Sequence, residues 1–119
     1  MYRAEFVISE NNKKPFLEFI SMLTEDEKAD IFSSIDLICE LKNRGLRIPE
    51  KLSKFLRNGI FELRVHHKNK ISRCFYFFVK EQRIIFTHGF IKKTDKTPNN
   101  EINKAERLRE QYYLNNKEL

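Results

Sequence analysis

The chain has 119 residues, enough for one domain that folds around its own hydrophobic core without disulfides or metal. Its 11 Phe and 4 Tyr, set against only 3 Gly and 3 Pro, exclude collagen-like and linker-like sequences. The 23 Lys and Arg residues exceed the 17 Asp and Glu residues, so the net charge is +6 and a negatively charged partner is expected.

The first part of the chain predicts one strand and two helices. Residues 2–8 are rich in β-forming side chains and predict a short strand. Pro15 suits the first turn of a helix, and Thr24 with Glu27 forms a capping box that begins a second helix. Gly45 can end that helix in a left-handed conformation. Apolar residues recur at helical spacing, with Phe16, Phe19, Ile20 and Leu23 in the first helix and Ile31, Ile35 and Ile38 in the second.

A connector is predicted over residues 46–58, where an Asn-Gly turn signal follows a polar stretch. Three strand-like runs come next, at residues 61–66, 71–80 and 83–93, and short polar turns join them into an antiparallel meander. The second run is apolar on both faces except near its start, so it is expected to lie at the centre of the sheet.

The last helix is predicted to begin where Thr97 caps it and Pro98 takes its first position. The element order is then β-α-α-β-β-β-α, and the fold class is α+β in a single domain spanning residues 1–119. We expect an antiparallel sheet of about four strands with helices on one face. The other face of the sheet would be solvated or would bind a partner.

The two cysteines, Cys39 and Cys74, exclude a secreted disulfide scaffold and are too few for a cysteine-ligated zinc site. The longest apolar run, residues 75–79, is far too short to span a membrane, and the N-terminus lacks the apolar core of a signal peptide. These features predict a soluble protein in a reducing compartment, the cytoplasm.

The positive charge is concentrated in one segment. Residues 1–50 have 7 basic and 10 acidic side chains, whereas residues 51–96 have 12 basic and 3 acidic side chains. Such a concentration is typical of proteins that bind a phosphate-rich partner. The alternative is an ordinary charged surface that keeps the protein soluble.

Two arginines are expected to face each other across the first hairpin. If the strands pair around the turn at residues 67–70, Arg64 lies opposite Arg73, and both side chains point to the same face. Two like charges in this position destabilise a sheet unless an anion bridges them, which favours a phosphate site. The alternative is that Glu62 pairs with one arginine as a surface salt bridge, worth at most about 1 kcal/mol.

Several side chains near the arginines could transfer protons or hold a phosphate backbone. His66 shares the face of Arg64, and histidine is the side chain that exchanges protons near neutral pH. Glu62 is expected to orient Arg64, and His88 to pack among core aromatic rings. Lys92 and Lys93 point to opposite faces of a strand, so at most one reaches the site; alternation groups Lys92 with residues 84, 86, 88 and 90.

A family resemblance is carried by residues 52–64, Leu-Ser-Lys-Phe-Leu-Arg-Asn-Gly-Ile-Phe-Glu-Leu-Arg, by Arg73 in the next strand, and by the Phe-x-Lys-Lys-Thr sequence that ends at Thr94. The final helix adds Thr97-Pro98 followed by Glu101, Ala105 and Arg107. This combination resembles the RelE/HigB toxin superfamily, in particular its phage-derived, HigB-like branch. The motifs cover about half of the chain, and the element order covers all of it.

The resemblance implies a toxin of a type II toxin–antitoxin pair. Such toxins are ribosome-dependent endonucleases that cut mRNA without metal or another cofactor on the open face of the sheet. A helix-turn-helix antitoxin protein usually holds HigB-type toxins inactive. The implied substrate is mRNA on the ribosome, and no membrane is involved.

The sequence and the resemblance together assign the site residues. The candidate catalytic residues are Arg64, Arg73, His66 and Lys92. The candidate RNA-binding residues are Lys68, Lys70, Lys93, Lys96 and Glu62. Two alternatives remain open: a non-catalytic RNA- or ribosome-binding module of phage origin, and a protein that uses its sheet only to bind another protein.

Overall fold

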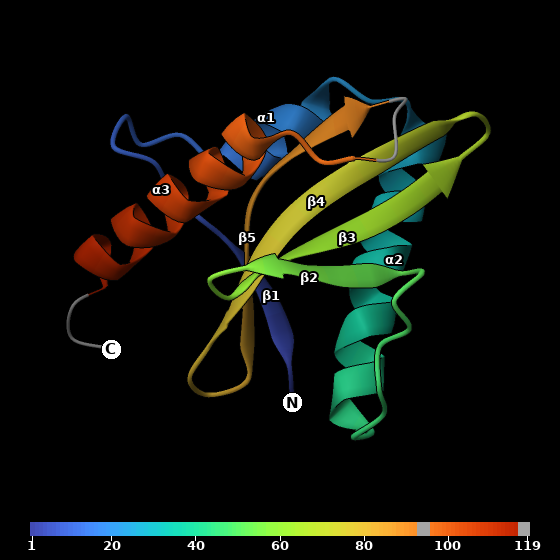
Figure 1. Ribbon diagram of the computed structural model, residues 1–119, viewed down its shortest axis with the longest axis horizontal. Helices are drawn as coiled ribbons and strands as arrows, with labels where there is room; N and C mark the ends of the chain where they lie inside the picture. The colour runs from blue at the N-terminus through green and yellow to red at the C-terminus, as the bar shows by residue number, and fades with distance from the viewer. Residues whose placement is uncertain (93–95, 117–119) are drawn as a thin grey trace.

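The computed structural model describes residues 1–92 and 96–116. The predicted α+β class is confirmed (Figure 1). In chain order the elements are β1 (Arg3–Phe6), α1 (Pro15–Ser21), α2 (Glu25–Asn43), β2 (Ser53–Arg57), β3 (Ile60–His67), β4 (Lys70–Val79), β5 (Arg83–Lys92) and α3 (Asn99–Asn115).

The five strands form one mixed sheet with the order β1-β5-β4-β3-β2. The predicted meander of β3, β4 and β5 is confirmed, and β4 is the central strand as expected. Two details differ from the expectation, because the sheet has a fifth strand and because β1 runs parallel to β5. The length and apolar pattern of β1 predict a strand, but they do not determine its direction or its neighbour.

The additional strand, β2, lies where a connector was predicted. It pairs with β3 through an Asn58-Gly59 turn, and both turn residues have positive φ angles, 51° and 80°. An Asn-Gly pair between two runs of β-forming residues is a strong hairpin signal. The strand was not predicted because the sequence of β2 is polar, as is typical of an edge strand.

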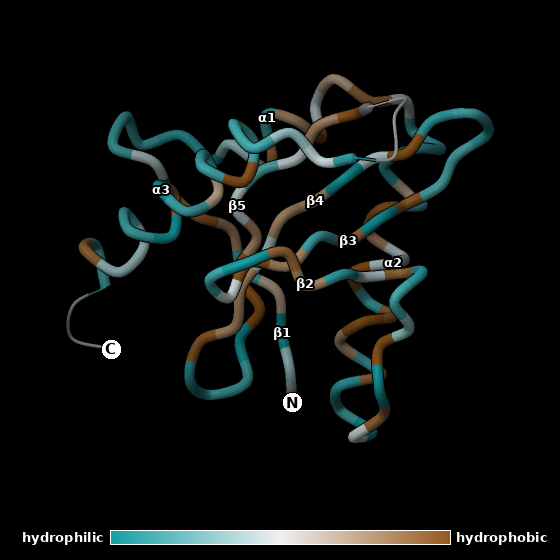
Figure 2. The backbone as a smooth tube through the Cα atoms, in the orientation of Figure 1, coloured by the Kyte–Doolittle hydropathy of each residue, from teal (hydrophilic) through white to brown (hydrophobic). Residues whose placement is uncertain are grey.

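The helices cover both faces of the sheet, so the prediction that they share one face was wrong. Helices α1 and α2 pack on the face with Leu63, Cys74, Tyr76 and Phe86. Helix α3 packs on the opposite face, where its partners include Ile60, Phe75, Phe77 and Ile85. The physical reason is the central strand, whose aromatic residues alternate between the two faces, so that each face needs a cover. Figure 2 shows the hydrophobic colouring along β4 in the middle of the sheet.

Helices α1 and α2 begin as the sequence predicts. Pro15 occupies the first turn of α1, and the Thr24–Glu27 capping box begins α2. Helix α3 begins differently, because Pro98 is its N-cap residue and no side chain caps it. The Thr97 hydroxyl donates a hydrogen bond to Glu62 instead. Among the helices that the structure describes, none is long and apolar enough to cross a membrane.

A bulge in β5 changes which residues share a face. Between the pairs Cys74–Gly89 and Tyr76–Phe86, β5 advances three residues while β4 advances two. Phe86 therefore packs with α1 and α2, whereas Phe90 packs on the α3 side. The simple alternation predicted for residues 84 to 92 was wrong, because a bulge adds one residue to the strand and reverses its phase.

Candidate functional site

The two arginines lie opposite each other, as predicted, and one carboxylate joins them. Arg64 pairs with Arg73 across β3 and β4. Glu62 Oε1 accepts a hydrogen bond from Arg64 Nε at 2.8 Å and another from Arg73 Nη1 at 2.8 Å. The other carboxylate oxygen of Glu62 accepts the hydrogen bond from Thr97. We call Glu62, Arg64, Arg73 and Thr97 the arginine cluster.

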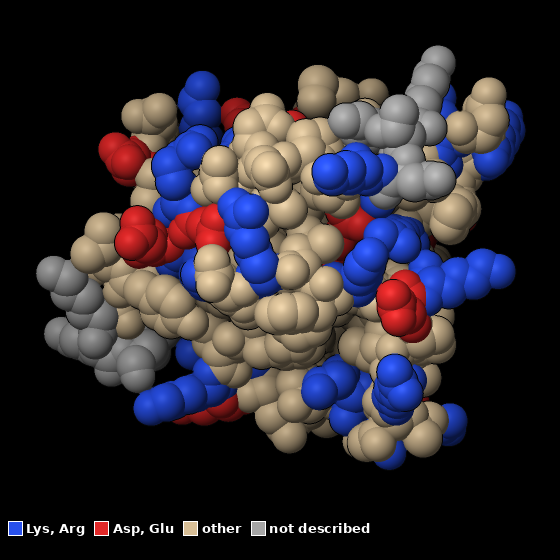
Figure 3. Space-filling view, viewed as in Figure 1, with Lys and Arg blue, Asp and Glu red and all other residues tan. Residues whose placement is uncertain are grey.

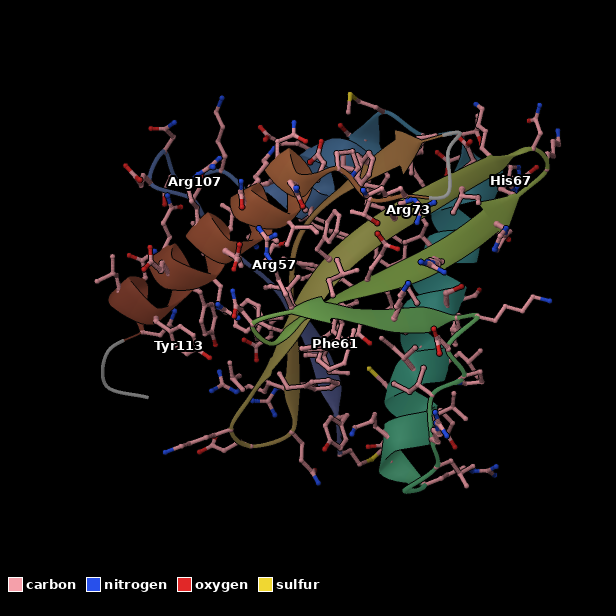
Figure 4. All side chains as sticks on the ribbon, viewed as in Figure 1. Arg57, Phe61, His67, Arg73, Arg107 and Tyr113 are labelled. Atoms are coloured by element: carbon pink, nitrogen blue, oxygen red, sulfur yellow. The ribbon has the colours of Figure 1, made fainter. Side chains whose placement is uncertain are left out.

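The anion that the opposed arginines require is therefore part of the chain itself. Glu62 is fully buried and Arg73 is 1% exposed, so their ion pair differs from the surface bridge considered for Glu62. The Arg64 side chain is 24% exposed and is the member of the arginine pair that reaches solvent (Figure 4 shows Arg73 to the right of α3). A buried carboxylate held by two guanidinium groups fixes the orientation of both.

A hollow of about 540 Å³ lies beside Arg64. Its walls come from α2, from the segment before β2 and from β3, and they include Asp30, Lys51, Arg64 and His66. His66 is exposed, so the structure brings the predicted Arg64 and His66 together at one open surface. The hollow has the charged and hydrogen-bonding groups that a nucleotide phosphate needs.

The other predicted lysines are spread along the same end of the molecule. Lys68 lies in the β3–β4 turn with a φ of 54°, and Lys96 is exposed just before α3. Lys70 lies 3.5 Å from the carboxylate of Glu27, which partly neutralises the charge of the lysine. Lys92 is the last residue of β5, where it pairs with Ile71, and Lys93 lies outside the described residues.

Lysine and arginine side chains gather over β2, β3 and the β3–β4 turn, where few acidic groups are seen (Figure 3). Lys54 on β2 belongs to this surface, because it is exposed and lies directly opposite Glu62. Lys54 and Lys51 are candidate site residues that were not predicted from the sequence. Recognition of the Asn-Gly hairpin would have placed Lys54 on the face of the arginine cluster.

His88 is part of the core, as expected. It is 2% exposed, and its ring stacks on Phe75 with 4.8 Å between the ring centroids. Its Nε2 lies 2.9 Å from the Glu101 carboxylate, and its Nδ1 lies 3.2 Å from the Thr87 hydroxyl. Burial lowers the pKa of His88 to about 4, although the hydrogen bond to Glu101 opposes this shift. A neutral ring that donates from Nε2 to Glu101 satisfies these contacts.

The low pKa of His88 predicts a stability loss in acid. Because the ring is neutral in the folded protein, the unfolded chain binds an extra proton between pH 6.5 and about 4. Stability is complete above pH 6.5 and falls as the pH approaches 4, by on the order of 3 kcal/mol at about 1.4 kcal/mol per pKa unit. Urea unfolding measured across this pH range tests the prediction.

One variant tests whether His88 causes the stability loss in acid, and a second variant is its control. His88→Phe should flatten the pH dependence above pH 4.5, whereas His66→Gln at an exposed position should leave it unchanged. Glu101, Lys104 and Arg107 are the charged groups around the ring. Hydrogen bonds lower the carboxyl pKa of Glu27 and of Glu106 from 4.5, so these two carboxylates lose their stabilising effect mainly below that value, and the comparison is made above pH 4.5. An unchanged slope in His88→Phe would show that other groups cause the loss.

His67 and Cys74 are held by their surroundings. His67 Nδ1 lies 2.5 Å from the Asp30 carboxylate at the end of β3. Burial raises the pKa of the Cys74 thiol, so this side chain stays protonated and unreactive. Within residues 1–92 and 96–116, no group of three or more His, Cys, Asp and Glu side chains is placed to hold a metal ion.

Comparison with known families identifies the family to which the chain belongs. Residues 18–110 match the family described as phage derived protein Gp49-like (DUF891), and the chain belongs to this family. The family is toxin-like and of the RelE/HigB type. No match to the chain was found among the curated proteins. The matched residues include the whole arginine cluster.

Proposed function

We propose that this protein is the toxin of a type II toxin–antitoxin pair, in the HigB-like branch of its superfamily. Its activity would be cleavage of mRNA on the ribosome in the cytoplasm, without metal, and a helix-turn-helix antitoxin would restrain it. The observation that carries the proposal is the arginine cluster, in which a buried carboxylate holds Arg64 at the wall of an open basic hollow.

The chemistry follows from what RNA cleavage requires. The 2′-oxygen attacks the adjacent phosphorus, the bond from phosphorus to the 5′-oxygen breaks, and a proton moves from the first oxygen to the second. Negative charge accumulates on the phosphate oxygens in the transition state, where a preorganised guanidinium is most effective. Arg64 is the exposed group that can contact these oxygens, and Arg73 supports it from within the sheet.

Glu62 acts in this proposal as a positioning residue. Its carboxylate is fully buried and accepts hydrogen bonds from three side chains, so it orients the arginines and does not contact RNA. His66 is the proposed proton donor or acceptor, because it is exposed in the same hollow. Lys92 is proposed as a second catalytic cation because it belongs to the Phe-x-Lys-Lys-Thr motif.

The RNA backbone would follow the exposed cations around the hollow. Lys68, Lys96 and Lys54 are exposed along this surface, and Lys70 and Lys93 are proposed to extend it. Each lysine that neutralises a phosphate makes binding weaker at higher salt. The ribosome would orient the mRNA, and oriented binding can supply about 7–11 kcal/mol of the barrier. Activity on free RNA is therefore expected to be low.

The proposal is tested by production of the protein without an antitoxin. Growth should stop, and primer extension on translated mRNA should show new 5′ ends that are absent from the same transcript when its start codon is removed. A protein that leaves growth and translated mRNA intact does not have this function.

One observation favours a non-catalytic RNA- or ribosome-binding module as a second candidate. In the part of the chain that the structure describes, no hydrogen bond orients the His66 ring, whereas a general base is usually held by a partner. This module would bind ribosomes in a salt-sensitive manner and leave the mRNA uncut. Cleavage by the wild type that is lost in an Arg64 variant would reject it.

A further inference from the structure

Another hollow lies away from the arginine cluster, between the β4–β5 turn and the last turns of α3. It has a volume of about 320 Å³, and we call it the tyrosine hollow. Its walls are formed by Phe78, Val79, Lys80, Arg83, Tyr112 and Tyr113. Val79 follows Arg73 by six residues along β4, and a strand rises about 3.3 Å per residue, so the hollow lies about 20 Å from the arginine cluster.

The β4–β5 hairpin and α3 build this hollow together. Val79 pairs with Arg83 directly across the two strands, so both side chains point to the face that α3 covers. Arg83 Nη1 donates a hydrogen bond of 3.0 Å to the Tyr112 hydroxyl, and Arg83 Nε donates one of 3.1 Å to the C=O of Lys80. These two contacts hold the guanidinium in one orientation at the wall of the hollow.

Two hydrogen-bond donors at this wall lack an acceptor in the part of the chain that the structure describes. The Arg83 side chain is 8% exposed, and no hydrogen bond or ion pair with a described residue engages its Nη2. The Tyr112 hydroxyl accepts from Arg83, so its own proton is left to donate. Burial raises the pKa of Tyr112, which keeps this proton on the hydroxyl at neutral pH.

The charges around the hollow favour an anion. Lys80 is exposed at the hollow and pairs with no described residue. Glu5 lies 3.6 Å from Arg83 Nη1, but its second carboxylate oxygen pairs with Arg3 at 3.4 Å. Glu81 of the turn is exposed and does not line the hollow. The acidic side chains therefore offset only part of the positive charge at this end of the sheet.

The rest of the wall is apolar and largely aromatic. Tyr113 packs against Phe77 with 5.8 Å between the ring centroids, yet it is 50% exposed (Figure 4 labels Tyr113 near the C-terminal end of α3). An exposed ring beside buried donors offers a stacking surface with a hydrogen-bonding end. Sites for small molecules have this composition, with a few fixed polar groups in a mostly apolar hollow of about 300–1,000 Å³.

We propose that the tyrosine hollow binds a small aromatic carboxylate. The ring of the ligand stacks on Tyr113, and its two carboxylate oxygens accept hydrogen bonds from Arg83 Nη2 and from the Tyr112 hydroxyl. A carboxylate fits better than a phosphate, because two donors match two oxygens and the apolar walls leave further oxygens without partners. The inference goes beyond the proposed function, because this site lies apart from the arginine cluster and requires no RNA.

The test uses the full-length protein with cinnamate, a flat aromatic carboxylate, and with cinnamamide, its uncharged counterpart. Isothermal titration calorimetry should show saturable binding of cinnamate, and the amide should bind about tenfold more weakly, since it loses a hydrogen bond to a charged group. In NMR spectra, cinnamate should shift the backbone amide signals of Lys80 and Arg83.

Three variants locate the bound cinnamate. Tyr113→Ser should weaken its binding about tenfold through loss of the stacking surface, and Tyr112→Phe should do the same through loss of the hydroxyl donor. Leu114→Ser changes the next residue of α3, which is 62% exposed and does not line the hollow, so it is the matched control and should bind normally. Tyr113→Ser alters an exposed position, so it tests the inference even if Tyr112→Phe fails to fold.

Several outcomes would overturn the inference: no saturable binding of cinnamate, equal binding of cinnamamide, or an equal loss in Leu114→Ser. If Tyr113→Ser weakens binding of poly-uridine RNA and leaves cinnamate binding intact, the hollow is part of a nucleic-acid surface and the inference is also wrong. Growth arrest by Tyr113→Ser is measured separately and should persist, so failure of the cinnamate experiment is distinguishable from failure of the proposed function.

Discussion

Replacement of Arg64 by alanine should reduce cleavage of translated mRNA by about 10²-fold or more, the usual cost of removing one group that stabilises transition-state charge. The structure gives the reason, because Arg64 is the partly exposed member of a pair whose other member is buried. Primer extension over time after induction measures the rate. Arg64→Lys should retain a small part of the activity, since lysine has charge but no planar fork.

The matched control for this prediction is Arg44→Ala. Arg44 is exposed at the end of α2, where it pairs with Glu40 on the helix surface, and it lies outside the arginine cluster. Its loss should leave the cleavage rate unchanged. Equal activity of Arg64→Ala and the wild type would remove Arg64 from the mechanism, provided that urea unfolding shows both proteins to be folded.

Replacement of Glu62 by leucine should lower the free energy of unfolding by about 3–5 kcal/mol, the range for breaking a buried ion pair. The variant leaves two guanidinium groups opposite each other without the carboxylate that joins them. Urea unfolding at neutral pH measures the loss. For comparison, Glu40→Ala breaks an exposed pair on α2 and should change stability by less than about 1 kcal/mol.

The double variant Glu62→Leu with Arg73→Leu distinguishes charge from packing. Because apolar residues can replace a buried ion pair, the double variant should be more stable than Glu62→Leu alone. It should nevertheless be inactive in the cleavage assay, since Arg64 loses its partner Glu62. Additive losses from the two changes would show that the carboxylate and Arg73 stabilise the fold independently.

The parts of the fold that depend on local patterns could be predicted from the sequence. The Thr24–Glu27 capping box and the short turn after His67 each act through neighbouring residues, and the turn fixed the pairing of Arg64 with Arg73. The face covered by α3 and the direction of β1 depend on contacts between distant segments, which no local pattern contains. The bulge in β5 is also invisible to simple alternation.

The candidate site divides in the same way. The two arginines and His66 could be predicted from strand periodicity, because residues two apart share a face. The burial of Glu62 could not, because it depends on Thr97, which lies 35 positions away and is brought over the sheet only when α3 packs. Without knowledge of that contact, an acidic residue that lies between basic residues is predicted to be a surface group.

The hydrogen bond between Thr97 and Glu62 joins two segments that lie 35 positions apart in the sequence. A relative that replaces Glu62 with an apolar residue would gain nothing from a hydroxyl at position 97 and would have to neutralise its arginines in another way. Substitutions at positions 62, 64, 73 and 97 should therefore be correlated, so that grafting one segment from a relative destabilises the protein unless the others accompany it.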